Sequence, residues 1–394
     1  MVQTLEQVMG KTTIESSENP TEIRYALENL LYAPNDEIKE KIIDTFLDYL
    51  TARISEVNYN IKAYIAYYNS EPCGFVLSDL NPEYKSYGRK SGTFGWLFAK
   101  NKEVCKQLLK KCEIYAKKHR LRRIRGPINF PKNAMGYGLQ VSGFEQPLLY
   151  GVAFNDPSSE LGMWLPSLGY EMESEYTCLE VLEESWKKGN TLSRNLKLSC
   201  LTLEELEEKI DEIVELAGDS FSSLLPDTSG GGRENIEELL ALAIDIPKRY
   251  FHHDFFYDPF QKYTHIPEFI EAWKETDLEN MITVFPMILE RNTNKLVGML
   301  IGVLDYYQYW SRTYVSRVNV HTAMVRKGFS GMGVFSSLNN FGQATNRSMR
   351  GITYYEGTAI WSRNAKGMNN EQAINSIFPH CKPIRKHIIF EKQV

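Results

Sequence analysis

The chain lacks long apolar runs and a leader-like N-terminus. In its 394 residues no segment approaches the ~20 consecutive apolar residues that a membrane-spanning helix needs. Residues 1–6 read Met-Val-Gln-Thr-Leu-Glu, without the basic stretch and apolar run of a secretory signal. These absences predict a chain with no membrane span, and a cytoplasmic location is the simplest expectation.

Cysteine pairs and an excess of positive charge are also missing. None of the six cysteines stands in a Cys-x-x-Cys pair, so the sequence indicates neither a zinc site nor a disulfide framework. The formal net charge is −5, which argues against nucleic acid as the main partner. We therefore expect no metal and no nucleic acid, while the oligomeric state stays open.

What the chain does have is one order of elements, used twice. The first half predicts helices at 22–33 and 37–56, strands at 61–68, 73–77 and 91–99, a helix at 103–120, and closing strands at 123–130 and 170–181. The second half predicts a helix at 203–217, strands at 281–289 and 296–304, a strand through 325, a helix at 334–350, a strand at 352–360, a helix at 364–377 and a strand at 384–391. Gly298 then stands where Gly74 stands in the first half. The repeat predicts an α/β protein of two domains, 1–182 and 201–394, joined by a linker at 183–200.

Residues 324–333, Met-Val-Arg-Lys-Gly-Phe-Ser-Gly-Met-Gly, form a glycine-dense turn between a strand and a helix. Backbone N–H groups and the positive end of a helix dipole meet at such a joint, which suits a pyrophosphate. Gly328, Gly331 and Gly333 have no Cβ, so the backbone can approach an anion closely. A glycine-rich loop without a ligand is the alternative, since short glycine motifs are weak signals.

The order of elements, with this turn between the fourth strand and the third helix, resembles the GNAT superfamily of acyl-CoA acyltransferases. In that superfamily an Arg/Gln-x-x-Gly-x-Gly/Ala turn binds the CoA pyrophosphate. Gly331-Met332-Gly333 matches the second part, whereas the first position is Gly328. Arg326 and Lys327 lie just upstream and are expected to supply the positive charge.

The resemblance covers nearly the whole chain as a tandem pair and implies a fold and a cofactor. The fold would be two tandem GNAT-like domains, each a mixed twisted sheet flanked by helices. The co-substrate would be acetyl-CoA or a longer acyl-CoA. The residues expected to bind it are Met324, Val325, Arg326, Lys327, Gly328, Phe329, Ser330, Gly331, Met332, Gly333 and Asn364.

Two positions after the fifth strand bear on the resemblance. Asn364 occupies the place of an asparagine that faces the pantetheine arm in the superfamily, although a helix cap would explain it equally. Many members carry a tyrosine seven residues later that protonates the leaving thiolate. Here that position is Glu371, so the usual acid is absent.

The first half has no glycine turn. Residues 98–103, Phe-Ala-Lys-Asn-Lys-Glu, stand between its fourth strand and its third helix. By resemblance this half is a GNAT-like domain that lacks a CoA site. We expect it to brace the second half and to shape the acceptor cleft.

Acyl transfer to an amine needs a polarised carbonyl and a base. By resemblance the carbonyl bonds a backbone N–H near residues 323–325, in a gap between the fourth and fifth strands. Glu356 is the first candidate base, because a carboxylate within a hydrophobic strand has a raised pKa if it is unpaired. His321 is the second, since histidine titrates near neutrality. A Glu356 paired with an arginine, a structural His321, or a base acting through water are the alternatives.

An aromatic-rich insertion lies at 249–260. It predicts either a lid over an acceptor or acyl chain, or plain packing against the other half. His252, His253 and Asp254 do not predict a metal site, because adjacent side chains point to different sides. The preceding Ser-Gly-Gly-Gly at 229–232 is expected to be a flexible connector.

The leading hypothesis is an acyl-CoA-dependent N-acyltransferase that works by direct attack in the second half. Its acceptor would be an amine on a small molecule or a peptide. A variant takes the acyl group from an acyl carrier protein that docks on Arg326. The other hypothesis is a catalytically silent GNAT-like binding or scaffold protein, because the tyrosine and the motif arginine are missing.

Overall fold

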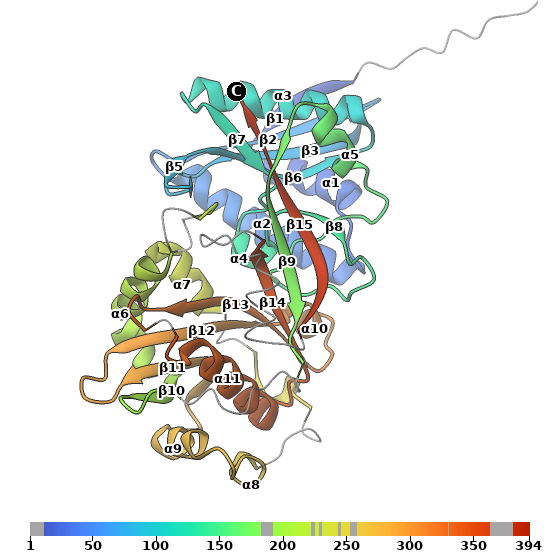
Figure 1. Ribbon diagram of the computed structural model, residues 1–394. Helices are drawn as coiled ribbons and strands as arrows, with labels where there is room; N and C mark the ends of the chain where they lie inside the picture. Colours follow the sequence, from blue (N-terminus) through green and yellow to red (C-terminus); the bar gives the residue numbers. More distant parts are fainter. Residues whose placement is uncertain are drawn as a thin grey trace, which may run out of the picture.

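The computed structural model describes residues 12–182, 192–221, 225–227, 231–242, 246–252, 258–329, 331–362 and 381–394. Two α/β halves lie one above the other in Figure 1, and two long strands run between them. These strands, β9 (Glu171–Glu180) and β15 (Lys382–Gln393), join the halves into one sheet.

The first half follows the predicted order with a few additions. Its strands are β1 (Thr13–Ser17), β2 (Asn60–Tyr68), β3 (Glu71–Leu80), β6 (Gly92–Ala99), β7 (Arg123–Gly126) and β8 (Leu139–Ser142), with a small hairpin of β4 (Lys85–Ser86) and β5 (Arg89–Lys90). Its helices are α1 (Pro20–Leu30), α2 (Asp36–Ser55), α3 (Lys102–Lys118), α4 (Lys132–Met135) and α5 (Leu161–Ser167). Asparagine caps fix three helix starts, since Asn19, Asn35 and Asn101 each accept a backbone N–H of the first turn.

The second half repeats the plan. Its strands are β10 (Leu196–Thr202), β11 (Met281–Glu290), β12 (Leu296–Leu304), β13 (Arg317–Val325) and β14 (Tyr354–Trp361). Its helices are α6 (Glu205–Ser220), α7 (Arg233–Leu242), α8 (Pro259–Lys262), α9 (Pro267–Glu275), α10 (Tyr306–Trp310) and α11 (Val334–Arg350), with a short 3-10 helix at Lys248–Tyr250. The predicted helix at 334–350 is confirmed as α11. The predicted helix at 364–377 lies outside the described residues.

Matching glycines support the internal repeat. A Cβ on Gly74 would lie 2.5 Å from Val104 Cγ1, and one on Gly298 would lie 2.6 Å from Val334 Cγ1. In each half a strand of the central hairpin therefore needs a glycine where the third long helix packs on it. The predicted equivalence of these two glycines is confirmed.

The sheet is continuous, with 13 strands and the order β1-β2-β3-β6-β7-β15-β9-β14-β13-β12-β11-β10, while β8 pairs with β15. β9, from the first half, pairs with β14 of the second. β15, the last strand of the chain, pairs with β7 of the first half and with β9. The two halves therefore exchange their closing strands, β9 and β15. The predicted division at 1–182 and 201–394 does not include this exchange. The predicted linker at 183–200 also overlaps β10, which begins at Leu196.

Candidate active site

A gap opens between β13 and β14, as the resemblance predicts. The two strands pair in parallel from Arg317 opposite Tyr354 to Val320 opposite Gly357. Beyond that point β14 bends at Ala359, whose φ is 52°, and continues along β9. β13 stays with β12 up to Val325. The two strands are therefore farthest apart at the carboxyl end of β13, where the glycine turn begins.

The backbone of β13 offers donors to this gap. Arg326 N–H donates to Val297 O on β12 at 2.8 Å, and N–H directions alternate along a strand. The N–H groups of Val325 and Ala323 therefore face away from β12, toward the gap. The Val325 carbonyl agrees with this direction, because it accepts the Ser220 hydroxyl of α6 at 3.2 Å.

A cavity of about 170 Å³ occupies the gap. Its walls come from His321, Thr322 and Ala323 of β13 and from Thr358 and Ala359 of β14. The first half supplies the opposite wall with Lys132, Asn133, Tyr137 and residues 151–153. The cavity is therefore built by both halves, although the strands that splay belong to the second.

The first-half wall is tied to the second half through Tyr150. Asp305 Oδ1 accepts the Tyr150 N–H at 3.2 Å, and Asn319 Nδ2 donates to the Tyr150 carbonyl at 3.0 Å. Thr358 in turn donates to Asn319 Oδ1 at 2.7 Å, which links β13, β14 and the wall. Gly151 needs its positive φ of 80° and its missing Cβ here, since a Cβ would lie 2.7 Å from Asn319 Nδ2.

His321 lies in the cavity and is a suitable proton acceptor. Its Nδ1 lies 3.0 Å from Thr322 Oγ1, and its side chain is half-buried. Burial, with a smaller contribution from the Lys132 charge, lowers the pKa of His321 to about 4. The imidazole is therefore neutral at pH 7 and has a lone pair for a proton, while the lowered pKa makes it a weaker base than an exposed histidine.

Glu356, the first candidate base, does not line the cavity. Its two carboxylate oxygens accept Arg385 Nε at 2.8 Å and Nη2 at 2.9 Å, and the Tyr354 hydroxyl donates at 2.8 Å. Both Glu356 and Arg385 are buried. The alternative of a buried glutamate paired with an arginine describes Glu356, because both of its oxygens already accept hydrogen bonds from these donors. The geometry favours His321 instead.

The glycine turn has the backbone that the sequence indicates. Gly328, Gly331 and Gly333 have φ values of 93°, 83° and 77°, which residues other than glycine rarely adopt. A Cβ on Gly328 or Gly331 would meet no atom within 4 Å, so the turn has open space beside it. Gly333 precedes α11 as its N-cap and has no side chain to cap it. The helix dipole therefore points its positive end at this turn.

Arg326 and Lys327 are engaged with α6. Arg326 Nη1 donates to Glu215 at 2.7 Å and its Nε to Leu296 O at 3.1 Å. The Lys327 N–H donates to Asp219 at 2.7 Å, and its Nζ lies 3.5 Å from the same carboxyl group. These contacts hold the turn against α6, and both cations have acidic neighbours, so charge supply to a phosphate would require an exchange of these partners.

The remaining predicted cofactor residues divide into three groups. Met324 is fully buried and Val325 half-buried on β13, so they can contribute backbone groups only. Phe329 is half-buried and packs at the edge of the second-half core, and Met332 is exposed. Ser330 and Asn364 lie outside the described residues, as does Glu371.

The aromatic insertion packs where it is described. Tyr250 contacts Tyr309 edge-on at 4.7 Å between ring centroids, and Phe251 is buried beneath the Arg350 guanidinium. Phe260 contacts Trp273 at 6.0 Å. These contacts favour packing over a lid, while residues 253–257, with His253 and Asp254, lie outside the described part.

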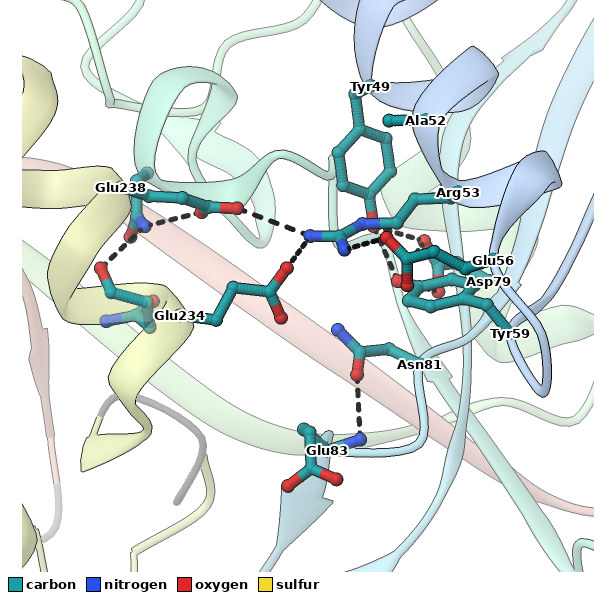
Figure 2. Close-up of polar contacts among 12 residues, drawn as sticks. Tyr49, Ala52, Arg53, Glu56, Tyr59, Asp79, Asn81, Glu83, Glu234 and Glu238 are labelled. Carbon is teal, nitrogen blue, oxygen red and sulfur yellow. Dashed lines mark hydrogen bonds and ion pairs between the residues drawn. The ribbon is translucent and has the colours of Figure 1, made fainter.

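A second, outer cleft of about 440 Å³ adjoins the cavity. It lies between α2 and α7, and it shares Lys132, Phe221 and Asn235 with the cavity. Figure 2 shows Arg53 of α2 reaching across to Glu234 and Glu238 of α7. The cleft lining is rich in charged groups of both signs, including Arg53, Glu83, Lys85, Arg233, Glu234 and Glu238.

A buried carboxyl group, that of Asp79, belongs to the same cluster as Arg53. Asp79 accepts the Tyr49 hydroxyl at 2.8 Å and the Tyr59 hydroxyl at 3.0 Å (Figure 2). Burial raises the pKa of Asp79 to about 7. The Arg53 guanidinium lies 5.1 Å from the centroid of each tyrosine ring. No sequence motif indicates this cluster, because its members come from α2, the residue before β2, β3 and α7.

The corresponding gap of the first half is filled by the chain itself. β6 and β7 pair only at Gly92–Ile124 and Thr93–Arg125. Beyond this the Trp96 N–H donates to Asn129 Oδ1 at 2.7 Å, and Trp96 Nε1 donates to Phe130 O at 2.9 Å. The start of α3 is capped by Asn101, which accepts the Val104 N–H at 2.9 Å. The chain itself therefore bonds the Trp96 and Val104 N–H groups at the positions where a cofactor would otherwise find donors.

No family model and no curated protein sequence matches the chain. Solved structures do match its fold. A tandem GNAT protein from the clavulanic acid biosynthesis pathway is similar over 97% of this chain and 98% of its own, with a TM-score of 0.53 and 10% identity. A fungal GCN5-related glucosamine N-acetyltransferase region is similar over 97% of this chain, with a TM-score of 0.58 and 10% identity. This chain spans 38% of that multi-domain protein. A probable N-acyltransferase from Enterococcus faecalis V583 matches over 98% of this chain and 73% of its own, with a TM-score of 0.50 and 9% identity.

These likenesses and the splayed strands define the class of fold. The chain has a tandem GNAT fold, a large mixed sheet flanked by helices. At identities of 9% and 10% these likenesses show the fold and do not indicate a particular substrate. Among the described residues, no helix is long and apolar enough to cross a membrane. In the same part of the chain no group of three His, Cys, Asp or Glu side chains is placed to hold a metal ion.

Proposed function

We propose that this protein transfers an acyl group from acyl-CoA to an amine by direct attack in the β13–β14 gap. The observation that carries the proposal is the cavity at this gap, whose lining includes His321 and Ala323 of β13. Acetyl-CoA or a longer acyl-CoA is the donor, and the cytoplasm is the expected location. The acceptor is an amine on a small molecule or a peptide.

The chemistry follows from the groups in the cavity. The thioester carbonyl takes a hydrogen bond from the N–H of Ala323 or Val325, which polarises it and stabilises the oxyanion of the tetrahedral intermediate. The neutral amine attacks the carbonyl carbon, and His321 takes the proton that the nitrogen loses as the C–N bond forms. The C–S bond then breaks, and the CoA thiolate takes a proton from His321 or from water.

The pyrophosphate of CoA would lie at the turn 328–333. The positive end of α11 and the open space beside Gly328 and Gly331 support this position. Lys327 is the nearest exposed cation, with 74% of its side chain exposed, and its ammonium can exchange Asp219 for a phosphate oxygen.

The acceptor would enter through the outer cleft, because that cleft shares Lys132, Phe221 and Asn235 with the cavity. Its charged lining suits a polar acceptor better than a hydrocarbon chain. The first half would then shape the acceptor site, as its wall at residues 151–153 suggests.

Release of CoA thiol tests this proposal directly. The purified protein is given acetyl-CoA and a panel of primary amines, and thiol release is compared with that of the His321→Ala variant. Amine-dependent release that His321→Ala abolishes supports the proposal. Absence of release with every amine and with acetyl, butyryl and octanoyl donors would refute it for CoA thioesters.

Two other hypotheses have an observation behind them. The ion pairs of Arg326 and Lys327 with α6 favour a silent binding or scaffold protein, because they remove the charge expected at the turn. The carrier-protein variant needs Arg326 on the docking surface, yet the Arg326 side chain is 13% exposed. Turnover with a loaded acyl carrier protein, lost in Arg326→Glu, would establish that variant.

A further inference from the structure

Helix α3 has a strongly basic exposed face in a chain that is acidic overall. Residues 100–123 contain ten lysines and arginines and two glutamates, a formal charge of +8 in a chain of −5. Of the two glutamates, Glu113 is buried and its carboxylate lies 2.8 Å from Lys392 Nζ. The exposed face of the helix therefore presents one carboxylate, that of Glu103, and six ammonium groups. The lysines that carry them are Lys102, Lys106, Lys110, Lys111, Lys117 and Lys118.

The equivalent helix of the second half shows that the fold does not require this charge. α11 packs on its sheet at Gly298 as α3 does at Gly74, yet its 17 residues include no lysine and none of them is exposed. α2, in the same half as α3, mixes both signs, with five acidic and three basic residues. A face that serves only to keep a protein soluble usually carries interspersed charges. The lysine face of α3 therefore indicates a partner with many negative charges.

The lysine face lies at an accessible end of the molecule. In Figure 1 α3 runs along the outer end of the first half, away from the second half. A groove of about 1090 Å³ lies beside it, and its lining includes Lys106, Lys110 and Lys111 of α3. Ile114, which also lines the groove, is 53% exposed between these lysines and those at the end of the helix. No residue of α3, all of which the structure describes, lines the reaction cavity or the outer cleft, so a partner on this face need not block either.

We propose that the lysine face of α3 binds the anionic surface of a phospholipid bilayer. Protein interfaces are depleted in lysine and are anchored by aromatic and arginine side chains. Nucleic acids are recognised through arginine forks and aromatic stacking. α3 has no arginine and no exposed aromatic residue. A bilayer needs neither, because each lysine near its surface is attracted separately, and an apolar side chain such as Ile114 can enter the headgroup region.

The charge of the remaining chain favours a single orientation on such a surface. Outside residues 100–123 the formal charge is −13, so an anionic bilayer repels the other faces of the protein on average. The protein would bind with α3 against the headgroups and with the second half directed toward the solvent. This binding concerns location and not chemistry, so it does not depend on the proposed acyl transfer.

Co-sedimentation of the full-length protein with lipid vesicles tests the proposal. Vesicles of phosphatidylcholine alone are compared with vesicles of equal parts phosphatidylcholine and phosphatidylglycerol, at about 0.1 M and about 1 M salt. We expect binding only to the anionic vesicles and only at the lower salt concentration, because salt screens the attraction. No binding to anionic vesicles at the lower salt concentration would overturn the proposal, as would equal binding to neutral vesicles.

A double substitution on α3 tests whether this face is the one that binds. Lys111→Ala with Lys118→Ala should weaken binding to anionic vesicles about 30-fold, since each lysine near the surface contributes about fivefold. Neither lysine has an ion-pair partner in the described part of the chain, and alanine favours a helix, so we expect the variant to fold. Lys41→Ala with Lys274→Ala is the matched control, because it removes the same charge from exposed lysines of α2 and α9. Equal losses in the two variants would overturn the proposal.

A substitution of Ile114 distinguishes a bilayer from a nucleic acid. Ile114→Ser should weaken vesicle binding about fivefold, because it removes a half-exposed apolar side chain that enters the headgroup region. Unchanged vesicle binding in this variant would contradict a bilayer as the partner. Binding of duplex DNA or single-stranded RNA that Lys111→Ala with Lys118→Ala abolishes, in the absence of vesicle binding, would assign the face to nucleic acid and overturn the proposal.

Discussion

The two halves share one plan but treat the gap between their fourth and fifth strands in opposite ways. In the first half Asn129 and Phe130 turn into the gap and bond Trp96, and Asn101 caps the following helix. In the second half β13 and β14 separate, no residue of the described part of the chain bonds across the gap in this way, and the helix begins at uncapped Gly333. A duplicated fold can therefore keep its architecture while its own chain occupies one of two equivalent sites.

The first half nevertheless remains part of the site. Its closing strand β9 carries β14, and its residues 151–153 face His321 across the cavity. The exchange of β9 and β15 explains why neither half is complete alone. The gap of the first half is filled, and the first half supplies a wall of the cavity in the second. In the proposed function the second half would bind the acyl donor, and the first half would bind the acceptor.

The largest expected effect is that of a substitution in the glycine turn beside the open gap. Gly331→Trp should lower acetyl-CoA affinity by at least about 100-fold, because a side chain at φ 83° strains the turn and fills the space for the anion. Calorimetry measures the affinity. Gly169→Trp is the matched control, since Gly169 has the same φ of 83° in the first half. Equal losses in both variants would show a general folding defect.

The next prediction concerns the base. His321→Ala should lower kcat by about 10²- to 10⁴-fold, the usual contribution of a general base, and leave acetyl-CoA affinity unchanged. Steady-state kinetics with the best amine of the panel measures it. His119→Ala, at the end of α3, is the control. Retention of full kcat would assign the proton transfer to water.

A third prediction concerns the plug of the first half. Asn129→Ala removes the acceptor of the buried Trp96 N–H and should lower the free energy of unfolding by about 1–3 kcal/mol. Asn129→Asp keeps the acceptor oxygen and should cost less. Urea unfolding measures both. Neither variant should change acetyl-CoA affinity, and a gain of a second binding site in Asn129→Ala would show that the plug alone closes this gap.

A fourth prediction uses the lowered pKa of His321. The folded pKa of about 4 lies below the ordinary 6.5, so the unfolded state binds more protons between these values. The stability that the neutral ring provides is complete above pH 6.5 and is lost as pH falls toward 4. The wild type should therefore lose about 1–2 kcal/mol relative to His321→Gln between pH 7 and 5. Parallel pH dependence of the two proteins in urea unfolding would contradict the lowered pKa.

The smallest effect is expected at Arg326. Because its guanidinium is paired with Glu215, Arg326→Gln should change acetyl-CoA affinity by less than about threefold. A loss above tenfold would show that Arg326 leaves Glu215 for the phosphate when CoA binds.

Local patterns predicted the elements well. The helix 334–350 and the hairpin of β11 and β12 follow from apolar periodicity and a polar turn between two strands. The glycine turn was predicted because its residues are contiguous. What the sequence left open depends on pairings between distant residues. It could not decide between a free Glu356 and one paired with an arginine, because Arg385 lies on β15, and it did not indicate Glu215 of α6 as the partner of Arg326.

The exchange of β9 and β15 was missed for the same reason. Both segments read as strands, but nothing in their sequence states which neighbour each pairs with. The contribution of α4 to the cavity wall was missed because this helix has only four residues and carries no motif. The cavity exists only after both halves are assembled.

The number of acetyl-CoA molecules bound per chain tests the central comparison most directly. Isothermal calorimetry on the full-length protein should give one site, abolished by Gly331→Trp and retained in Gly169→Trp. A stoichiometry of two would contradict the plugged gap of the first half, and the absence of binding would contradict the open gap of the second.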